Sequence, residues 1–426
     1  MIRPALLALA VLAPALAAPA LQEFILPTGL KCILVENHDR PMVRVELVTR
    51  WSPDDPAVKD RTAAFLTLLL DRAGAGSYSR AAFNRAVDDL GMDFAFQSRL
   101  ESCQWSLVAD SRSQEAAFAL LADAVFRPAF DGPMVEAQRQ ALIKQAGVPA
   151  LRERGMARFQ WSVLHPQAQA LPLRTALDRV EFAGLQTLHR RLVRPELSTL
   201  AIYGDLSLAQ ARELALLHLG VWGPSPVPAP VAAPEVAGAD TTLAVLEARP
   251  RAELWAGAAR PAKAGQAAAE ELLAIMLART GLAPSGKLEL SATLTRGTRS
   301  ILVLKAVAGE TAREALVPGV LAILDAWRTR GFTAEDLGRA RIQWQAELAS
   351  LPLHPQALLN RTLQGALDPE LSRAVAAVSL QEVNGLLATW LAPAKLRFLL
   401  LGGDAALVQA AEAAGLGPVA QLTPDN

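Results

Sequence analysis

The sequence predicts an α+β fold arranged as two related halves, and three observations lead to this prediction. Runs typical of strands and of helices both occur along the 426 residues, a length that suits two or three domains. A stretch of small residues with five prolines, GPSPVPAPVAAPEVAGA at 223–239, has the composition of an extended linker. On each side of it an apolar strand runs into Gly-Asp and then an alanine-rich helix, at 200–206 and at 398–405.

The first element in chain order is a targeting segment. Residues 1–20, MIRPALLALAVLAPALAAPA, place Arg3 before a short apolar run and end in two small-x-small sites at 15–17 and 18–20. This is the pattern of a cleaved signal peptide, and the apolar run is too short to span a bilayer. No cysteine follows it to carry a lipid anchor, and no later stretch reaches 18 apolar residues. We therefore expect an exported protein, periplasmic or extracellular, with no membrane span.

Composition excludes several classes of function. The chain has 42 basic and 42 acidic residues and a formal net charge of zero, so we expect no nucleic acid as partner. Its two cysteines, Cys32 and Cys103, are too few for a disulfide scaffold or a thiolate zinc cluster. Each lies in a predicted strand. Export would permit one disulfide between them, and two buried free thiols are equally compatible with the sequence.

The remaining elements of the first half follow from periodicity and capping residues. Strands are predicted at 29–36 and 42–49, joined as a hairpin through the turn 37–41. Asp60 can cap a helix that ends near Arg72 before Gly74, and Ser79 can cap another that ends near Gly91. The later elements are strands at 92–99 and 102–109, helical patterns at 114–126, 133–163 and 181–192, a strand at 198–203 and a helix at 207–219.

Two sequence matches indicate that the second half repeats the first. Asp205 and Asp404, which follow the two apolar strands, lie 199 residues apart. A phenylalanine followed nine residues later by an arginine occurs at 130 and again 202 residues further on. The similar spacings predict a duplicated α+β unit, with domains at 21–222 and 240–426.

Several segments together suggest a family. They are LPTGLK at 26–31, VENHDRP at 35–41, LHRR at 188–191, RPE at 194–196, Gly-Asp at 204–205 and GVW at 220–222. In order and spacing they resemble the pitrilysin/insulinase family of zinc metallopeptidases, with a two-domain chain like that of mitochondrial processing peptidase. The resemblance implies two homologous domains, each an antiparallel sheet packed with helices, that face each other as a clamshell.

The same resemblance implies that the catalytic metal site is missing. Active members carry H-x-x-E-H on a helix, where two histidines bind zinc and the glutamate activates water. With Gly74 placed on the glycine after that motif, the two histidine positions are Phe65 and Leu69, the general-base position is Leu68, and the third ligand position is Gln145. Apolar side chains cannot bind zinc. We therefore expect no zinc, no other cofactor and no catalytic residue of the family kind.

Some bacterial members lack the zinc motif and use an arginine and a tyrosine, seven residues apart, to hold the substrate for a catalytic partner chain. The resemblance places these positions at Leu277 and Pro284, neither of which preserves the family residue. Arg279 is a candidate replacement for the arginine, and a solvent-facing arginine at a helix end is the simpler interpretation.

Other catalytic chemistries find no support in the sequence. The five histidines show no metal-ligand spacing, and no G-x-S-x-G or phosphate-binding motif occurs. The apolar run around 65–70 exceeds what a one-sided surface helix needs. It predicts either a helix buried on all sides or an apolar face that docks a partner.

We therefore predict an inactive homologue of the pitrilysin/insulinase peptidases. Its predicted role is the non-catalytic subunit of a heterodimer with an active zinc-bearing paralogue, forming a chamber that degrades peptides. A stand-alone peptide-binding or scaffold protein is the alternative, with unfolded peptides as partners. A peptidase or other hydrolase with a displaced active site is a third.

Overall fold

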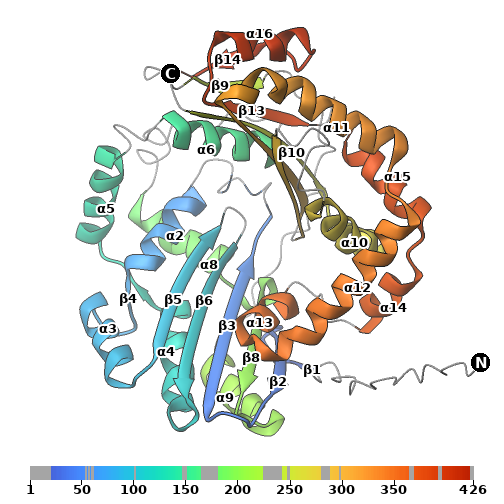
Figure 1. Cartoon of the computed structure of the whole chain (residues 1–426). Helices are drawn as coiled ribbons and strands as arrows, with labels where there is room; N and C mark the ends of the chain where they lie inside the picture. Colours follow the sequence, from blue (N-terminus) through green and yellow to red (C-terminus); the bar gives the residue numbers. More distant parts are fainter. Residues whose placement is uncertain are drawn as a thin grey trace, which may run out of the picture.

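The computed structural model of the chain describes residues 21–52, 55, 58, 62–99, 102–145, 151–164, 181–223, 242–246, 250–279, 288–296, 299–363, 369–391 and 396–422. The predicted signal peptide lies outside these ranges, as does the predicted linker except for Gly223. Two six-stranded sheets form the centre of the molecule, one in each half (Figure 1). A third sheet pairs β4 (Gly74–Ala75) with β7 (Pro128–Ala129).

Each large sheet is composed of strands from its own half of the chain. The first has the order β1 (Leu21–Ile25), β2 (Lys31–Glu36), β8 (Ser198–Gly204), β3 (Met42–Arg50), β6 (Ser102–Asp110) and β5 (Asp93–Arg99). The second has the order β11 (Leu288–Arg296), β12 (Arg299–Gly309), β10 (Arg251–Pro261), β13 (Arg397–Leu401), β9 (Thr242–Val245) and β14 (Val419–Gln421).

Strand pairing corrects two predictions. β2 and β3 do not form a hairpin, because β8 lies between them, parallel to β2 and antiparallel to β3. The turn at 37–41 therefore passes over the end of β8, where Asn37 N donates to Gly204 O at 3.0 Å. The sheets are also not purely antiparallel, since the β2–β8, β9–β13 and β9–β14 pairs are parallel. β1, which the sequence did not predict, pairs antiparallel with β2.

Gly204 is required where β8 ends beside that turn. Its φ of 130° lies in a region that L side chains rarely adopt. A Cβ at this position would lie 2.0 Å from the Met42 carbonyl oxygen. The Gly-Asp pattern noted in the sequence therefore has a steric cause in the first half of the chain.

Helices occupy both halves. In the first they are α2 (Thr62–Arg72), α3 (Arg80–Asp89), α4 (Gln114–Phe126), α5 (Gly132–Gln145), α6 (Leu151–Leu164), α8 (Phe182–Leu192) and α9 (Leu208–Leu219). In the second they are α10 (Ala267–Ala278), α11 (Leu316–Arg330), α12 (Ala334–Ser350), α13 (Pro355–Leu363), α14 (Pro369–Ala377), α15 (Leu380–Trp390) and α16 (Ala405–Ala413). Ser79 and Ser207 cap α3 and α9. The pattern at 133–163 is two helices, α5 and α6.

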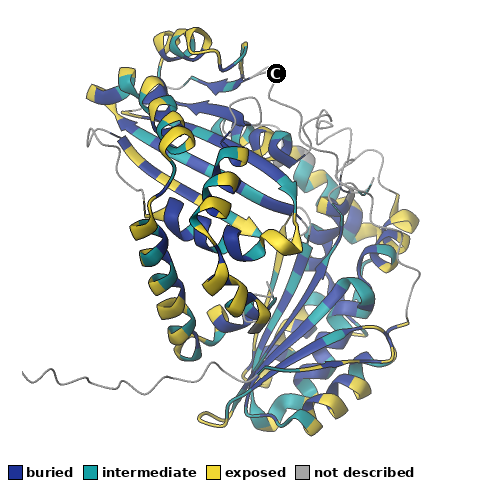
Figure 2. Ribbon diagram, turned by 90° about the vertical axis from the view of Figure 1, so that its right-hand side faces the viewer, coloured by how far each residue is buried: buried dark blue, intermediate teal, exposed yellow. Residues whose placement is uncertain are grey.

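The two halves repeat the same five-strand pairing. β2, β3, β5, β6 and β8 of the first half correspond in chain order and direction to β9, β10, β11, β12 and β13 of the second. Each half also has its own apolar core. Figure 2 shows buried residues along the strands of both sheets. The segments at 130–139 and 332–341 both lead into long helices, α5 and α12.

Two helices cross from one half to the other, and we call α6 and α13 the exchanged helices. α6, from the first half, packs on β9, β10 and β13 of the second sheet through Phe159 and Val163. α13, from the second half, packs on β3 and β8 of the first sheet through Leu358 and Leu359. We call the sheet face that carries an exchanged helix its inner face.

The cysteines do not form a disulfide. Cys32 lies on β2 and Cys103 on β6, with β8 and β3 between them in the sheet, and both are buried free thiols. Three strand spacings of about 4.8 Å separate them, whereas disulfide Cα atoms lie about 4.4–6.8 Å apart. The open alternative is thus settled in favour of free thiols.

Both thiols are expected to be unreactive in the native protein. Burial raises the pKa of Cys32 to about 12 and that of Cys103 well above its ordinary value, so neither forms the reactive thiolate at neutral pH. Titration with a disulfide reagent at pH 8 should label neither cysteine in buffer and both in denaturant. Rapid labelling of either thiol in buffer would contradict the burial.

Candidate functional site

Helix α2 carries the positions where the sequence resemblance expects the metal-binding histidines. Phe65 is 3% exposed and Leu69 is 0% exposed, and both belong to the apolar core of the first half. Leu68, at the general-base position, is partly buried against the same core. α2 packs against β5 on one side and α8 on another. The space around Phe65 and Leu69 is therefore filled by hydrocarbon. The predicted helix buried on all sides is not observed, because Ala64 on the same helix is exposed.

The third ligand position lies at the end of another helix. Gln145 is the last residue of α5, and its side chain lies outside the described part of the molecule. Within the described ranges, no group of three His, Cys, Asp or Glu side chains could hold a metal ion.

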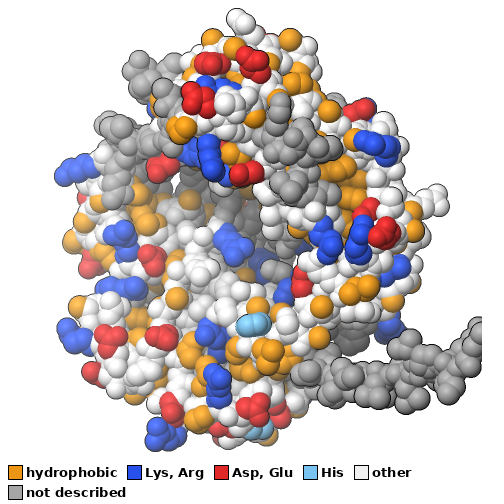
Figure 3. Space-filling view, viewed as in Figure 1, with side chains coloured by type: hydrophobic (Ala, Val, Ile, Leu, Met, Phe, Trp, Pro, Cys, Tyr) orange, Lys and Arg blue, Asp and Glu red, His pale blue; other side chains and the backbone are white. Residues whose placement is uncertain are grey.

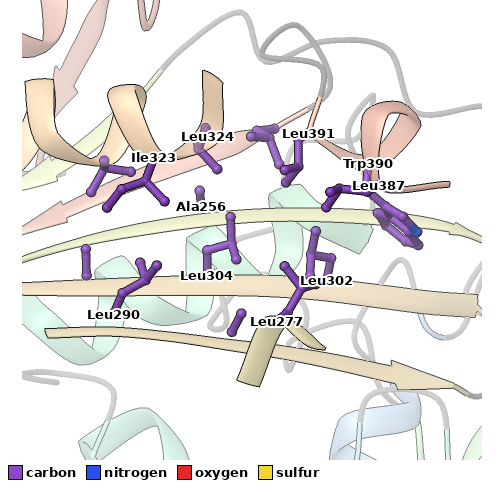
Figure 4. Packing of buried hydrophobic residues seen from close by; sticks show 14 of the residues in the cluster. Ala256, Leu277, Leu290, Leu302, Leu304, Ile323, Leu324, Leu387, Trp390 and Leu391 are labelled. Carbon is purple, nitrogen blue, oxygen red and sulfur yellow. The ribbon is translucent and has the colours of Figure 1, made fainter. Parts of the chain in front are cut away.

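Of the two positions in the second half where the resemblance expects substrate-binding residues, one is buried and the other lies outside the described residues. Leu277 is 1% exposed and packs into the core of the second half with Leu302 and Leu304 of β12 (Figure 4). Pro284 lies outside the described residues. Arg279 follows α10 and donates a hydrogen bond to Gln343 Oε1 at 3.0 Å. It lines a cavity of about 330 Å³ whose walls come from α10, α11, α12 and the turn between the last two. Arg279 is exposed at this helix end, and its role in substrate contact stays a prediction.

The inner face of the first sheet carries a buried carboxylate, Glu46 of β3. The side chain is 0% exposed and accepts hydrogen bonds from Gln104 Nε2 at 2.8 Å, from Gln356 Nε2 at 2.9 Å and from the Ser106 hydroxyl. Arg44 Nη1 lies 3.5 Å from Glu46 Oε1. Gln356 belongs to the exchanged helix α13, so Glu46 fastens that helix to the sheet. Both oxygens of the carboxylate are therefore engaged by neighbouring side chains.

Glu253 of β10 fastens the other exchanged helix, α6, to the second sheet. Arg152 of the exchanged helix α6 donates to it at 2.7 Å, the Trp255 indole donates at 2.8 Å, and Lys305 Nζ lies 3.6 Å away. Burial alone would raise the pKa of Glu253, but the hydrogen bonds from Arg152 and Trp255 hold it below its ordinary value. The second carboxylate is therefore an ionised anchor for α6.

Comparison with known proteins gives a result at the level of fold. No family model and no curated protein matches the sequence. Among solved structures, a protease from Helicobacter pylori superposes with a TM-score of 0.71 at 14% identity, covering 90% of this chain and 99% of that one. A peptidase M16 inactive domain from Pseudomonas fluorescens gives 0.71 at 16% identity, covering 90% and 98%. The first half of the periplasmic protease PqqL from Escherichia coli gives 0.68 at 14% identity, covering 95% and 94%.

The chain has the fold of the M16 peptidases. The resemblance inferred from the sequence motifs is thereby confirmed for the architecture over nine-tenths of the chain. Within the described residues of this M16 fold, no helix is both long enough and apolar enough to cross a membrane.

The M16 fold of this chain also has a cavity on its helical layer that the sequence did not indicate. It measures about 700 Å³ and lies among the C-terminal ends of α4, α8 and α9. His189 and His218 line it, although they lie 29 positions apart in the chain, and Nε2 of each is buried without a hydrogen-bond partner. His189 is 6% exposed. Of the other histidines, His38 is exposed and its Nδ1 lies 2.7 Å from Asp205 Oδ1.

Buried His189 is expected to make stability depend on pH. Burial lowers the pKa of His189 from 6.5 to about 4; the hydrogen bond with the Val125 backbone opposes this, and the charge of Arg190 adds to it. Between pH 6.5 and 4, His189 is protonated in the unfolded chain and neutral in the folded chain. The contribution of neutral His189 to the free energy of unfolding is therefore fully present above pH 6.5 and is lost as the pH falls towards 4. The loss should approach about 3 kcal/mol at pH 4. Urea unfolding at pH 7 and pH 4.5 should show a smaller loss for His189→Gln than for the native sequence, and equal losses would contradict this origin.

Proposed function

We propose that this chain is an exported, non-catalytic M16-type subunit that pairs with an active zinc-bearing paralogue to form a peptide-degrading chamber. The observation that carries the proposal is the burial of Phe65 and Leu69 where the family would place zinc ligands. The chain keeps the whole fold but has apolar core residues at the metal position. Such a chain is suited to form part of the chamber wall and to contact a partner. No metal or other cofactor is part of the proposal.

The proposal treats the two halves as homologous domains, 21–222 and 240–426, joined by the linker 223–239 and arranged as a clamshell. The repeated five-strand pairing and the near-equal sequence offsets support a duplication. The inner faces, each carrying a helix from the other half, would form the concave side of the clamshell. Export rests on the signal-peptide pattern at 1–20, and one solved structure of the same fold is described as a periplasmic protease.

A stand-alone peptide-binding or scaffold protein is the second candidate. It is favoured by the polar surface left on the inner face of the first sheet, where Gln97 and Arg99 of β5 are exposed. A peptidase with a displaced site has less support, since the buried carboxylates Glu46 and Glu253 are both engaged in anchoring helices.

Co-expression separates the first two candidates. A neighbouring reading frame that encodes H-x-x-E-H would supply the partner to be tested. We expect the two chains to co-purify at a one-to-one ratio, with peptidase activity that disappears when the partner's motif glutamate is changed. Chains that never co-purify, with partner activity unchanged by this one, would reject the heterodimer.

Zinc analysis of the purified chain tests the displaced-site candidate. We expect well below one zinc per chain after dialysis and no hydrolysis of a casein or peptide substrate. One tightly bound zinc with peptidase activity would overturn the proposal of an inactive subunit.

A further inference from the structure

Two arginines on the inner face of the first sheet lie side by side. Ser102 of β6 pairs with Arg50 of β3 on one side and with Arg99 of β5 on the other. Directly paired residues point to the same face of a sheet, and Arg50 shares the face of Glu46 because they are four residues apart on one strand. Two strand spacings put the two arginine Cα atoms about 10 Å apart, within reach of each other's long side chains.

Among the described residues, no carboxylate forms an ion pair with either arginine. Arg44, on the same strand as Arg50, differs in this respect, because its guanidinium lies 3.5 Å from Glu46. Arg50 donates one hydrogen bond, to the Leu363 carbonyl at 3.1 Å. The acidic residue of β5, Asp93, stands six residues away along the strand, about 20 Å from Arg99.

The two positive charges repel each other across the sheet. Burial lowers the pKa of Arg50, and the positive charge of Arg99 lowers it further. Two like charges brought together in a partly buried place are stabilised when an anion lies between them.

The surroundings supply further hydrogen-bond donors. The next paired row holds Gln104 of β6 and Gln97 of β5, and Gln97 is exposed. β5 is an edge strand, with β6 as its only neighbour in the sheet among the described strands. Figure 3 shows the molecule hollowed between its halves, with basic side chains inside the hollow over the ends of β3, β5 and β6. A chain lying on this face would therefore meet guanidinium, hydroxyl and amide groups.

We propose that Arg50 and Arg99 form a carboxylate-binding site that selects acidic peptides on the inner face of the first sheet. This selectivity rests on the proposed role of that face as the wall of a peptide chamber. Guanidinium groups suit carboxylates because their N–H donors form paired, charge-assisted hydrogen bonds. Since the chain as a whole is neutral, the preference would be local and not a general attraction of acidic molecules.

Fluorescence anisotropy with the full chain from residue 21 tests the site. The probes are a labelled extended octapeptide with two glutamates and the same peptide with glutamines in their place. We expect the acidic peptide to bind about tenfold more tightly at 50 mM salt, with the difference shrinking at 500 mM salt. Arg99→Gln and Arg50→Gln should each remove most of that difference, and Arg99→Lys should restore part of it.

Arg85→Gln is the matched control, because Arg85 is an exposed arginine on α3, away from the inner face, and should leave both affinities unchanged. A second readout does not depend on peptide. Arg99→Gln should raise the thermal midpoint in low salt, since it relieves the repulsion on Arg50. If the two peptides bound equally, or if the preference for the acidic peptide survived both arginine substitutions, the carboxylate site would be wrong. The proposed role of the face as a chamber wall would not be affected by that result. Binding of neither peptide would overturn both the carboxylate site and the proposed role of this face as a chamber wall.

Discussion

Replacing Leu69 by histidine is expected to lower the free energy of unfolding by about 4 kcal/mol without creating a zinc ligand. Leu69 is 0% exposed in the core of the first half. The substitution replaces buried hydrocarbon by an imidazole of similar size that has no polar partner, and burial of an unpaired polar group costs about 2–7 kcal/mol. Urea unfolding gives the change in stability, and metal analysis gives the zinc content. The same reasoning applies to Phe65→His.

Ala64→His is the control, because Ala64 lies on the exposed side of the same helix. That substitution should cost less than about 1 kcal/mol, the size of the difference in helix propensity, so any larger effect of Leu69→His reflects burial. If Leu69→His kept the native unfolding midpoint and bound one zinc per chain, the position would be an accessible metal site. The proposed loss of chemistry at α2 would then be wrong.

Local patterns predicted the individual elements well. β5, β6 and α4 lie within one residue of their predicted bounds, and Ser79 caps the helix that the sequence assigned to it. These elements depend on periodicity and on side chain to backbone hydrogen bonds between close neighbours, which a sequence displays directly. Burial at Phe65 and Leu69 was visible for the same reason, as an apolar run.

Pairing between distant segments was not predictable in this way. β8 enters the sheet between β2 and β3, from about 150 residues further along the chain, and no local signal in the turn at 37–41 distinguishes that from a hairpin. The contact from Gln356 to Glu46 spans 310 residues. Whether Cys32 and Cys103 form a disulfide could not be predicted either, because only the strand order shows that they are too far apart. Without register, Arg50 and Arg99 are two unrelated basic residues.

The exchanged helix α6 leads to the second prediction of large effect. Phe159 is 2% exposed and lies against Gly257 of β10, where a Cβ would stand 2.9 Å from its ring. Gly257 therefore leaves the room that the ring fills, and Phe159→Ala should leave a cavity that costs about 3–5 kcal/mol. Urea unfolding measures the loss. Gln160→Ala, one position further on and exposed, should cost less than about 0.5 kcal/mol.

The pattern of unfolding distinguishes a local cavity from a loosened interface between the halves. α6 belongs to the first half but covers the second sheet, and Arg152 ties it to Glu253. If this contact couples the halves, the native chain should unfold in one transition followed by both tryptophan fluorescence and circular dichroism. Phe159→Ala should separate those two curves, because one half can then lose structure before the other. A single shifted transition in the variant would place the coupling elsewhere, with α13 on the first sheet as the remaining connection. Two transitions would show that the packing of α6 on the second sheet makes the two halves of the native chain unfold together.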